Sequence, residues 1–68
     1  MRYAVVIEGE PGSYSAYVPD LPGCVSIGDT LDEVRHEIQE AIRFHIDGLI
    51  EDHLPVPEPT SVVDYVEA

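Results

Sequence analysis

The chain has 68 residues, of which 14 are acidic and three are basic, so its formal net charge is −11. This charge disfavours a nucleic-acid partner, because nucleic-acid affinity depends mainly on cationic side chains that displace counterions from phosphates. It favours a basic protein partner, although acidity also keeps a protein soluble without any partner. The length predicts a single domain, residues 1–68. A domain of this size buries only about 60% of the surface that its unfolded chain exposes.

Self-association is the remaining way to stabilise so small a domain. The single cysteine, Cys24, excludes an internal disulfide, and no cysteine and histidine cluster indicates a structural metal. We therefore expect a homo-oligomer, a dimer or tetramer, with no cofactor and no metal. The sequence shows no signal peptide and no apolar run long enough to cross a bilayer, so we expect a cytoplasmic protein with no membrane partner.

Three short strands are predicted in the first half of the chain. Apolar residues alternate with other residues over positions 3–8 and again over positions 14–18. The turn-rich segment 9–13 between them indicates an antiparallel hairpin. A third strand over residues 25–27 extends this meander.

Two local signals separate the third strand from its neighbours. Pro22 and Gly23 predict a type II turn before it, because proline presets the first central φ and glycine accepts the positive φ of the second. After it, Thr30 and Glu33 predict a capping box, in which each side chain accepts a hydrogen bond from an unpaired amide. We therefore expect a helix to begin at Leu31.

The predicted helix is long and amphipathic. Its apolar residues recur at intervals of three and four and form one stripe, which favours packing against one face of a sheet. The stripe consists of Leu31, Val34, Ile38, Ala41, Ile42, Ile46 and Leu49. The helix should end near Asp52 or His53, because Pro55 restricts Leu54 to extended geometry.

The remaining residues predict a connector and a fourth strand. Alternating prolines over residues 54–59 indicate a stiff, extended connector, and residues 62–66 have the composition of a strand. The predicted order is therefore β-β-β-α-β. This is an α+β fold, in which a three-stranded antiparallel meander is followed by one long helix and a C-terminal strand.

This succession of motifs resembles the HicB-like antitoxin family over nearly the whole chain. The family motif comprises Pro19, Asp20, Leu21, Pro22, Gly23 and Cys24, and then Gly28, Asp29 and Thr30. Segments within residues 3–8, 14–18 and 40–59 match in the same order. The resemblance implies a partial ribonuclease-H-like HicB fold. It also implies a partner, HicA, a small basic ribonuclease with a catalytic histidine.

Two functions are compatible with this resemblance. In the first, the chain is an antitoxin-like inhibitor that covers the active site of a HicA-type mRNA-cleaving toxin and needs no chemistry of its own. In the second, it is an orphan oligomeric protein with no toxin partner and an unknown protein-binding or regulatory role. Many members of the family carry a DNA-binding module after this domain, and this sequence ends before one, so we expect no direct binding of nucleic acid.

Candidate contact residues lie on the predicted helix. Exposed acids on its polar side are candidates for a basic partner: Asp32, Glu40, Asp47 and Glu51. Phe44 lies off the apolar stripe beside Gly48, and a glycine inside a helix costs about 1 kcal/mol relative to alanine, so we expect a packing reason. Either the connector at residues 55–59 folds back onto this pair, which we slightly favour, or a second subunit covers it.

Catalysis is not expected. The ribonuclease-H-like topology raises the alternative of a two-Mg²⁺ site, for which Glu8, Asp20 and Asp29 are the only candidates. Turns and helix caps favour aspartate for backbone reasons alone, so two of these positions have a structural explanation. Cys24 should pack in the core, because no cation near it would activate a thiol.

Overall fold

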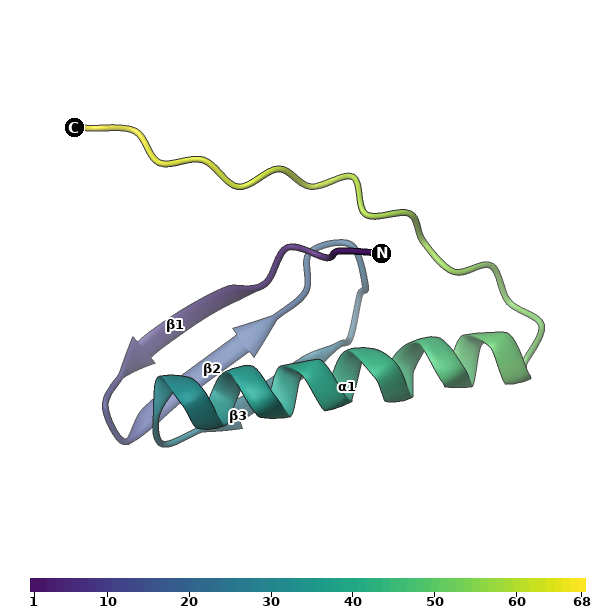
Figure 1. The fold of residues 1–68 in the computed structure, drawn as a ribbon, viewed down its shortest axis with the longest axis horizontal. Helices are drawn as coiled ribbons and strands as arrows, with labels where there is room; N and C mark the ends of the chain where they lie inside the picture. The colour runs from purple at the N-terminus through teal and green to yellow at the C-terminus, as the bar shows by residue number, and fades with distance from the viewer.

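The computed structural model describes residues 1–68, which form three strands and one helix in the order β1-β2-β3-α1. Strands β1 (Val6–Glu10), β2 (Ser13–Tyr17) and β3 (Val25–Gly28) form one antiparallel sheet in the order β1-β2-β3. Helix α1 (Leu31–Glu51) packs on one face of this sheet, against β3 and β2 (Figure 1). The α+β class, the meander and the helix bounds are confirmed.

The hairpin between β1 and β2 is tighter than the sequence predicts. Glu10 pairs with Ser13, so only Pro11 and Gly12 form the turn, and Gly12 takes a φ of 89° that side chains rarely adopt. β1 also begins later than predicted, at Val6. The residues before it leave the sheet, and the Tyr3 hydroxyl donates a hydrogen bond to the Pro57 carbonyl at 2.6 Å.

The predicted type II turn is present between β2 and β3. The Cys24 amide donates to the Leu21 carbonyl at 3.0 Å, and Gly23 has a φ of 85°. The turn places both Leu21 and Cys24 in the core, where they are 0% and 3% exposed. This part of the family motif therefore has a structural role in the core.

The core lies between α1 and the face of the sheet that α1 covers. Six residues are buried: Ala16, Val18, Leu21, Cys24, Val34 and Ile38. The first turns of α1 approach β3 closely because Gly28 has no side chain. A Cβ at Gly28 would lie 2.7 Å from the backbone nitrogen of Val34.

The ends of α1 agree with their sequence signals. Thr30 is the N-cap, and its Oγ1 accepts a hydrogen bond from the Glu33 amide at 3.1 Å. The reciprocal half of the predicted capping box does not form, since the Glu33 carboxylate accepts no bond from Thr30. At the other end, the Asp52 amide donates to the Gly48 carbonyl.

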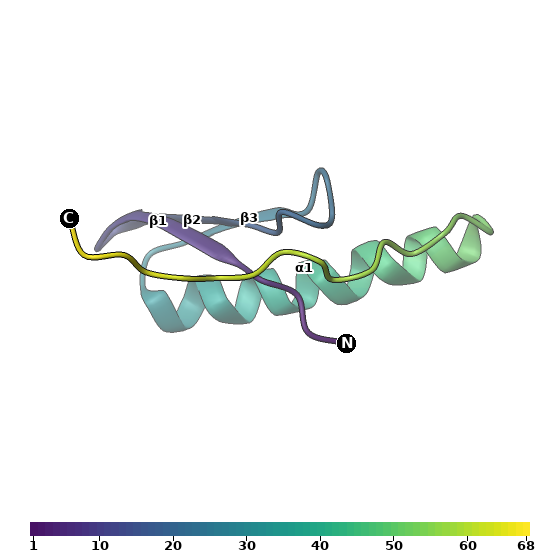
Figure 2. The same cartoon turned by 90° about the horizontal axis from the view of Figure 1, so that it is seen from above.

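The predicted C-terminal strand is wrong for the single chain. Residues 62–66 are extended but pair with no strand of the sheet. Hydrogen bonds to Pro57, Thr60 and Ser61 hold the preceding segment across the N-terminal residues instead (Figure 2). Residues 62–66 consequently pass on the β1 side of the sheet, away from α1, without joining it (Figure 1).

The molecule is elongated and exposes more surface than a compact domain. Its radius of gyration is 13.0 Å, with extents of 40 × 27 × 16 Å, and α1 extends past the end of the sheet (Figure 1). A compact chain of 68 residues has a radius of gyration of about 11 Å. The accessible surface is 5341 Å², whereas a folded monomer of this mass exposes about 4,250 Å².

Candidate partner-binding surfaces

The charge of this chain is almost entirely unpaired. Only one of the 14 acidic side chains lies close to a basic group. That pair is Asp32 with Arg35, at 3.5 Å between Oδ1 and Nη1, with both side chains exposed to solvent. An exposed pair of this kind contributes less than about 1 kcal/mol. The surface therefore presents a strong negative field to any partner.

The four helix acids predicted as partner contacts are all exposed. Asp32, Glu40, Asp47 and Glu51 lie on α1. By the helical period they fall within about 100° of one another, on the side of α1 turned away from the apolar stripe. At 1.5 Å per residue the row is about 28 Å long. It offers a basic partner four carboxylates, and His36 and Arg43 lie between them on the same side of the helix.

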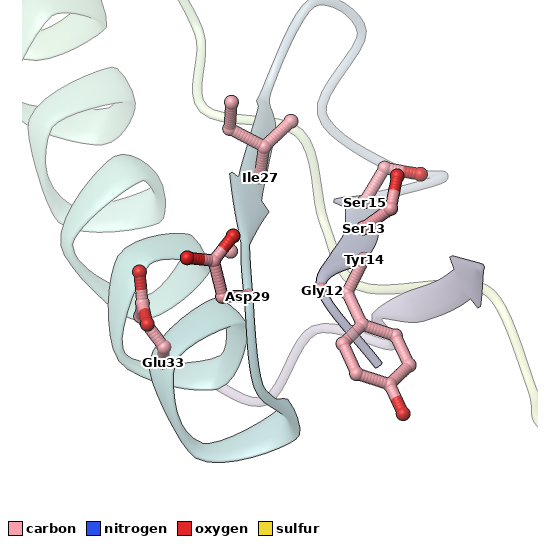
Figure 3. Close-up of a pocket in the computed structure, with 8 residues that line it drawn as sticks. Gly12, Ser13, Tyr14, Ser15, Ile27, Asp29 and Glu33 are labelled. Carbon is pink, nitrogen blue, oxygen red and sulfur yellow. The ribbon is translucent and has the colours of Figure 1, made fainter. Parts of the chain in front are cut away.

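A second acidic feature lies where α1 begins. A hollow of about 310 Å³ opens between the adjoining ends of β2 and β3 and the first turn of α1. Figure 3 shows Asp29 and Glu33 on one side of this hollow and Ser13 and Ser15 on the other. Carboxylates accept hydrogen bonds from cations and hydroxyls add further acceptors, so the hollow suits a lysine or arginine side chain.

Sequence reasoning identified only part of this hollow. The sequence marks Asp29 as a motif residue and Glu33 as a capping residue, whereas no local pattern marks Ser13 and Ser15. The signal for the serines is the register of the sheet, in which Ser15 lies opposite Ile27, beside Gly28 and Asp29. The register depends on the tight turn at residues 11–12, which the sequence predicted only as a longer connector.

Asp20 of the family motif anchors the segment that follows α1. Its Oδ2 accepts hydrogen bonds from the amides of Thr60 and Ser61, at 3.1 and 3.0 Å. Its Oδ1 accepts from the hydroxyls of the same two residues, at 3.1 and 2.9 Å. The Ser61 amide is the main reason that the pKa of Asp20 lies below its ordinary value of 3.8, and the other three bonds act in the same direction against partial burial.

The three acids of the alternative two-metal site do not come together. Asp20 follows the end of β2, whereas Asp29 lies beside the start of β2 at the opposite end of the sheet. Glu8 lies in β1, opposite Ser15. No group of three histidine, cysteine, aspartate or glutamate side chains is arranged to hold a metal ion. The acids therefore provide no shared coordination site.

Cys24 is a core residue, as the sequence predicts. It is 3% exposed, and burial raises the pKa of its thiol above the ordinary value of 9.0. A raised pKa keeps the sulfur protonated and unreactive at neutral pH.

The connector does not cover Phe44, so that part of the prediction is wrong. The Phe44 side chain is 82% exposed, and a Cβ added at Gly48 would meet no atom within 4 Å. The connector turns towards the N-terminal residues instead, because Tyr3 binds the Pro57 carbonyl. The other alternative, a second subunit over Phe44, stays a prediction.

The face of the sheet opposite α1 carries an apolar row that the sequence analysis did not identify. Val6 pairs with Tyr17, which pairs with Val25, so the three side chains line up across the sheet. Tyr17 and Val25 are 42% and 64% exposed, and Ile27 in the next row is 77% exposed. Alternation along each strand was the signal, since residues next to buried positions point to the other face.

Comparisons with known proteins relate this chain to one family. The family described as "HicB_like antitoxin of bacterial toxin-antitoxin system" matches residues 3–68. An uncharacterized 14.9 kDa protein of Haemophilus phage HP1 is 42% identical over 66 residues, covering 97% of this chain and 50% of the phage protein. A UPF0150 protein of Synechocystis sp. is 45% identical over 63 residues, covering 91% of this chain and 80% of that protein.

A solved structure has the same fold. It is described as "HicA3 and HicB3 toxin-antitoxin complex", and it matches with a TM-score of 0.75 and 28% identity over 88% of this chain and 70% of the other. The chain spans half the length of the phage relative. Its one helix is not long and apolar enough to span a membrane.

Proposed function

The chain belongs to the HicB-like antitoxin family, and we propose that it inhibits a small basic HicA-type toxin by binding over the toxin's active site. The observation that carries this proposal is the unpaired negative surface, with 14 acids and a single close ion pair. Inhibition by covering an active site requires no reactive group in the inhibitor. The exposed acids and the protonated Cys24 are consistent with such a passive role.

Two features supply the contact. The acids of the α1 row, at positions 32, 40, 47 and 51, occupy sites that the toxin would otherwise offer to RNA phosphates, because both groups are anionic acceptors. The hollow beside Asp29 and Glu33 receives one basic side chain. Opposite fields also speed the encounter of the two proteins and make it sensitive to salt.

We also propose that the chain self-associates as a dimer or tetramer and acts in the cytoplasm. The supporting observation is surface area: 5341 Å² is exposed, about 1,100 Å² more than a compact monomer of this mass exposes. Neither toxin binding nor self-association requires residues 1–68 to bind DNA, and the acidic surface disfavours DNA binding.

A binding experiment with a matched control tests the inhibitory role. The chain is mixed with a small basic HicA-type protein, and both Kd and mRNA cleavage are measured at rising salt. One variant replaces Asp32, Glu40, Asp47 and Glu51 by their amides. The control replaces four other exposed acids by their amides, so that both variants have the same net charge: Glu8, Glu10, Glu58 and Glu67.

We expect the helix variant to dissociate faster, because charges in the contact slow dissociation of the complex. We expect the control variant only to associate more slowly, because charges outside the contact affect the rate of encounter. Equal changes of both rates in the two variants would show that the acids of α1 do not contact the toxin. If no basic protein binds at any ionic strength, the antitoxin role is refuted and the orphan oligomeric alternative is favoured.

A further inference from the structure

We propose that residues 62–66, here called the arm, add as a β-strand to the outer edge of β1 in a second copy of this chain. This inference rests on the self-association proposed above and identifies the surface that produces it. The exchange is reciprocal: each copy extends its arm onto the β1 edge of the other.

The arm has the composition of a strand and is exposed along its length. Val62, Tyr65 and Val66 are 90%, 91% and 89% exposed, and Val63 is 57% exposed. Such consecutive β-branched and aromatic residues favour strands. None of the backbone hydrogen bonds outside the helix and sheet involves the arm, although buried strands pair nearly all such groups. The Tyr65 amide donates only locally, to Asp64 Oδ1 at 2.8 Å. The arm is thus a strand without a partner strand, with apolar side chains in water.

The structure fixes where the arm starts and in which direction it leaves. Asp20 accepts four hydrogen bonds from Thr60 and Ser61, the two residues before the arm. The Tyr3 hydroxyl holds Pro57 in the same stretch. These anchors keep the arm extended and away from its own β1, and an already extended segment loses less conformational entropy when it pairs.

The receiving edge is β1. In the sheet order β1-β2-β3 the two edges are β1 and β3, and α1 makes its closest packing against β3. The arm leaves on the β1 side (Figures 1 and 2). An unpaired edge presents a row of amide and carbonyl groups that recruits another strand. Two copies related by a two-fold axis therefore place each arm beside the other copy's β1.

The area available matches a second copy. The chain exposes 5341 Å², an excess of about 1,100 Å² over a compact monomer, and a standard interface removes about 800 Å² from each partner. A net charge of −11 on each copy opposes this association. Backbone pairing and apolar contact provide the attraction, and salt strengthens it by screening the repulsion. Binding of a basic toxin has the opposite salt dependence.

Two double variants of the full chain test the arm. In the first, Val63→Pro with Asp64→Pro removes two successive amides, which point to opposite sides of a strand, so one of them faces the pairing edge in either register. In the control, Val63→Ala with Asp64→Ala keeps both amides and loses the same side chains. Neither residue belongs to the core, so we expect both variants to keep the monomer fold, which circular dichroism checks. The self-association Kd is measured by sedimentation equilibrium at low and high salt.

We expect the proline variant to raise the Kd at least about tenfold relative to the alanine variant. A mixture of isotope-labelled and unlabelled wild-type chains should also show intermolecular NOEs between the arm and residues 6–10. Equal Kd values in the two variants would refute pairing of the arm with β1 of a second copy, but not self-association itself. NOEs confined to one chain would have the same meaning. A monomeric wild type would refute both proposals without affecting toxin binding.

Discussion

Gly28→Ala should destabilise this protein, although it adds only one methyl group. The Cβ would lie 2.7 Å from the Val34 nitrogen and 3.0 Å from its Cα, whereas ordinary contacts begin at 3.4 Å. The atoms in the way belong to the helix backbone, so α1 or β3 must move by several tenths of an ångström. Val34 is fully buried, and the movement disturbs its packing in the core.

Overpacking of this kind costs about 1–3 kcal/mol, and reduced freedom of the unfolded chain recovers up to about 1 kcal/mol. The expected net loss is about 1–2 kcal/mol. A domain of 68 residues has a total stability of about 3–10 kcal/mol, so this loss should lower Tm by about 4–16 °C. Urea and thermal unfolding followed by circular dichroism, at two protein concentrations, measures it.

Gly48→Ala is the matched control because it makes the same chemical change in α1. No atom lies within 4 Å of the added Cβ, and Gly48 has no positive φ. The helix should gain about 0.5–1 kcal/mol. A Gly28→Ala protein as stable as the wild type would refute the close approach of α1 to β3. Destabilisation by Gly48→Ala that depends on protein concentration would reveal a second copy packed on this part of α1.

Three further substitutions test individual contacts. Asp20→Asn should release Ser61, lowering the urea midpoint at pH 7 and speeding amide exchange at Ser61. The folded pKa of Asp20 is depressed, so its contribution to stability is present above the ordinary pKa of 3.8 and is lost as pH falls through the folded value. The two proteins should therefore become equally stable in acid, and a difference that stays constant with pH would contradict this. Ser26→Ala removes a buried hydroxyl that has no hydrogen-bond partner, so stability should stay constant or rise by up to about 1 kcal/mol. A clear drop in the urea midpoint would mean that the hydroxyl has a hydrogen-bond partner. Phe44→Ala removes a ring that is 82% exposed, so stability at low protein concentration should change by less than about 0.5 kcal/mol; a larger change there would show that the ring packs within its own chain.

The candidate surfaces were only partly predictable. The acids of the α1 row were predictable because helical periodicity assigns each residue to one side of a helix. The hollow was not, because Ser13 and Ser15 meet Asp29 only through the strand register. The position of Phe44 was predicted correctly relative to the stripe, but the connector that was expected to cover it lies elsewhere.

The sequence by itself determined the features that depend on neighbours a few residues apart. Thr30 caps α1, Pro22 and Gly23 form the turn, and the apolar stripe gives the helix its buried side. These interactions link residues at most four positions apart, or repeat with the period of the element, so they can be predicted from the sequence alone.

Only the tertiary structure decided which distant segments meet. Asp20 binds residues 60 and 61 across 40 positions, and Tyr3 binds Pro57 across 54. These contacts decide that residues 62–66, despite their strand composition, join no sheet in the single chain. A strand requires an edge at hydrogen-bonding distance, and that distance depends on how the whole chain folds rather than on the residues of the strand.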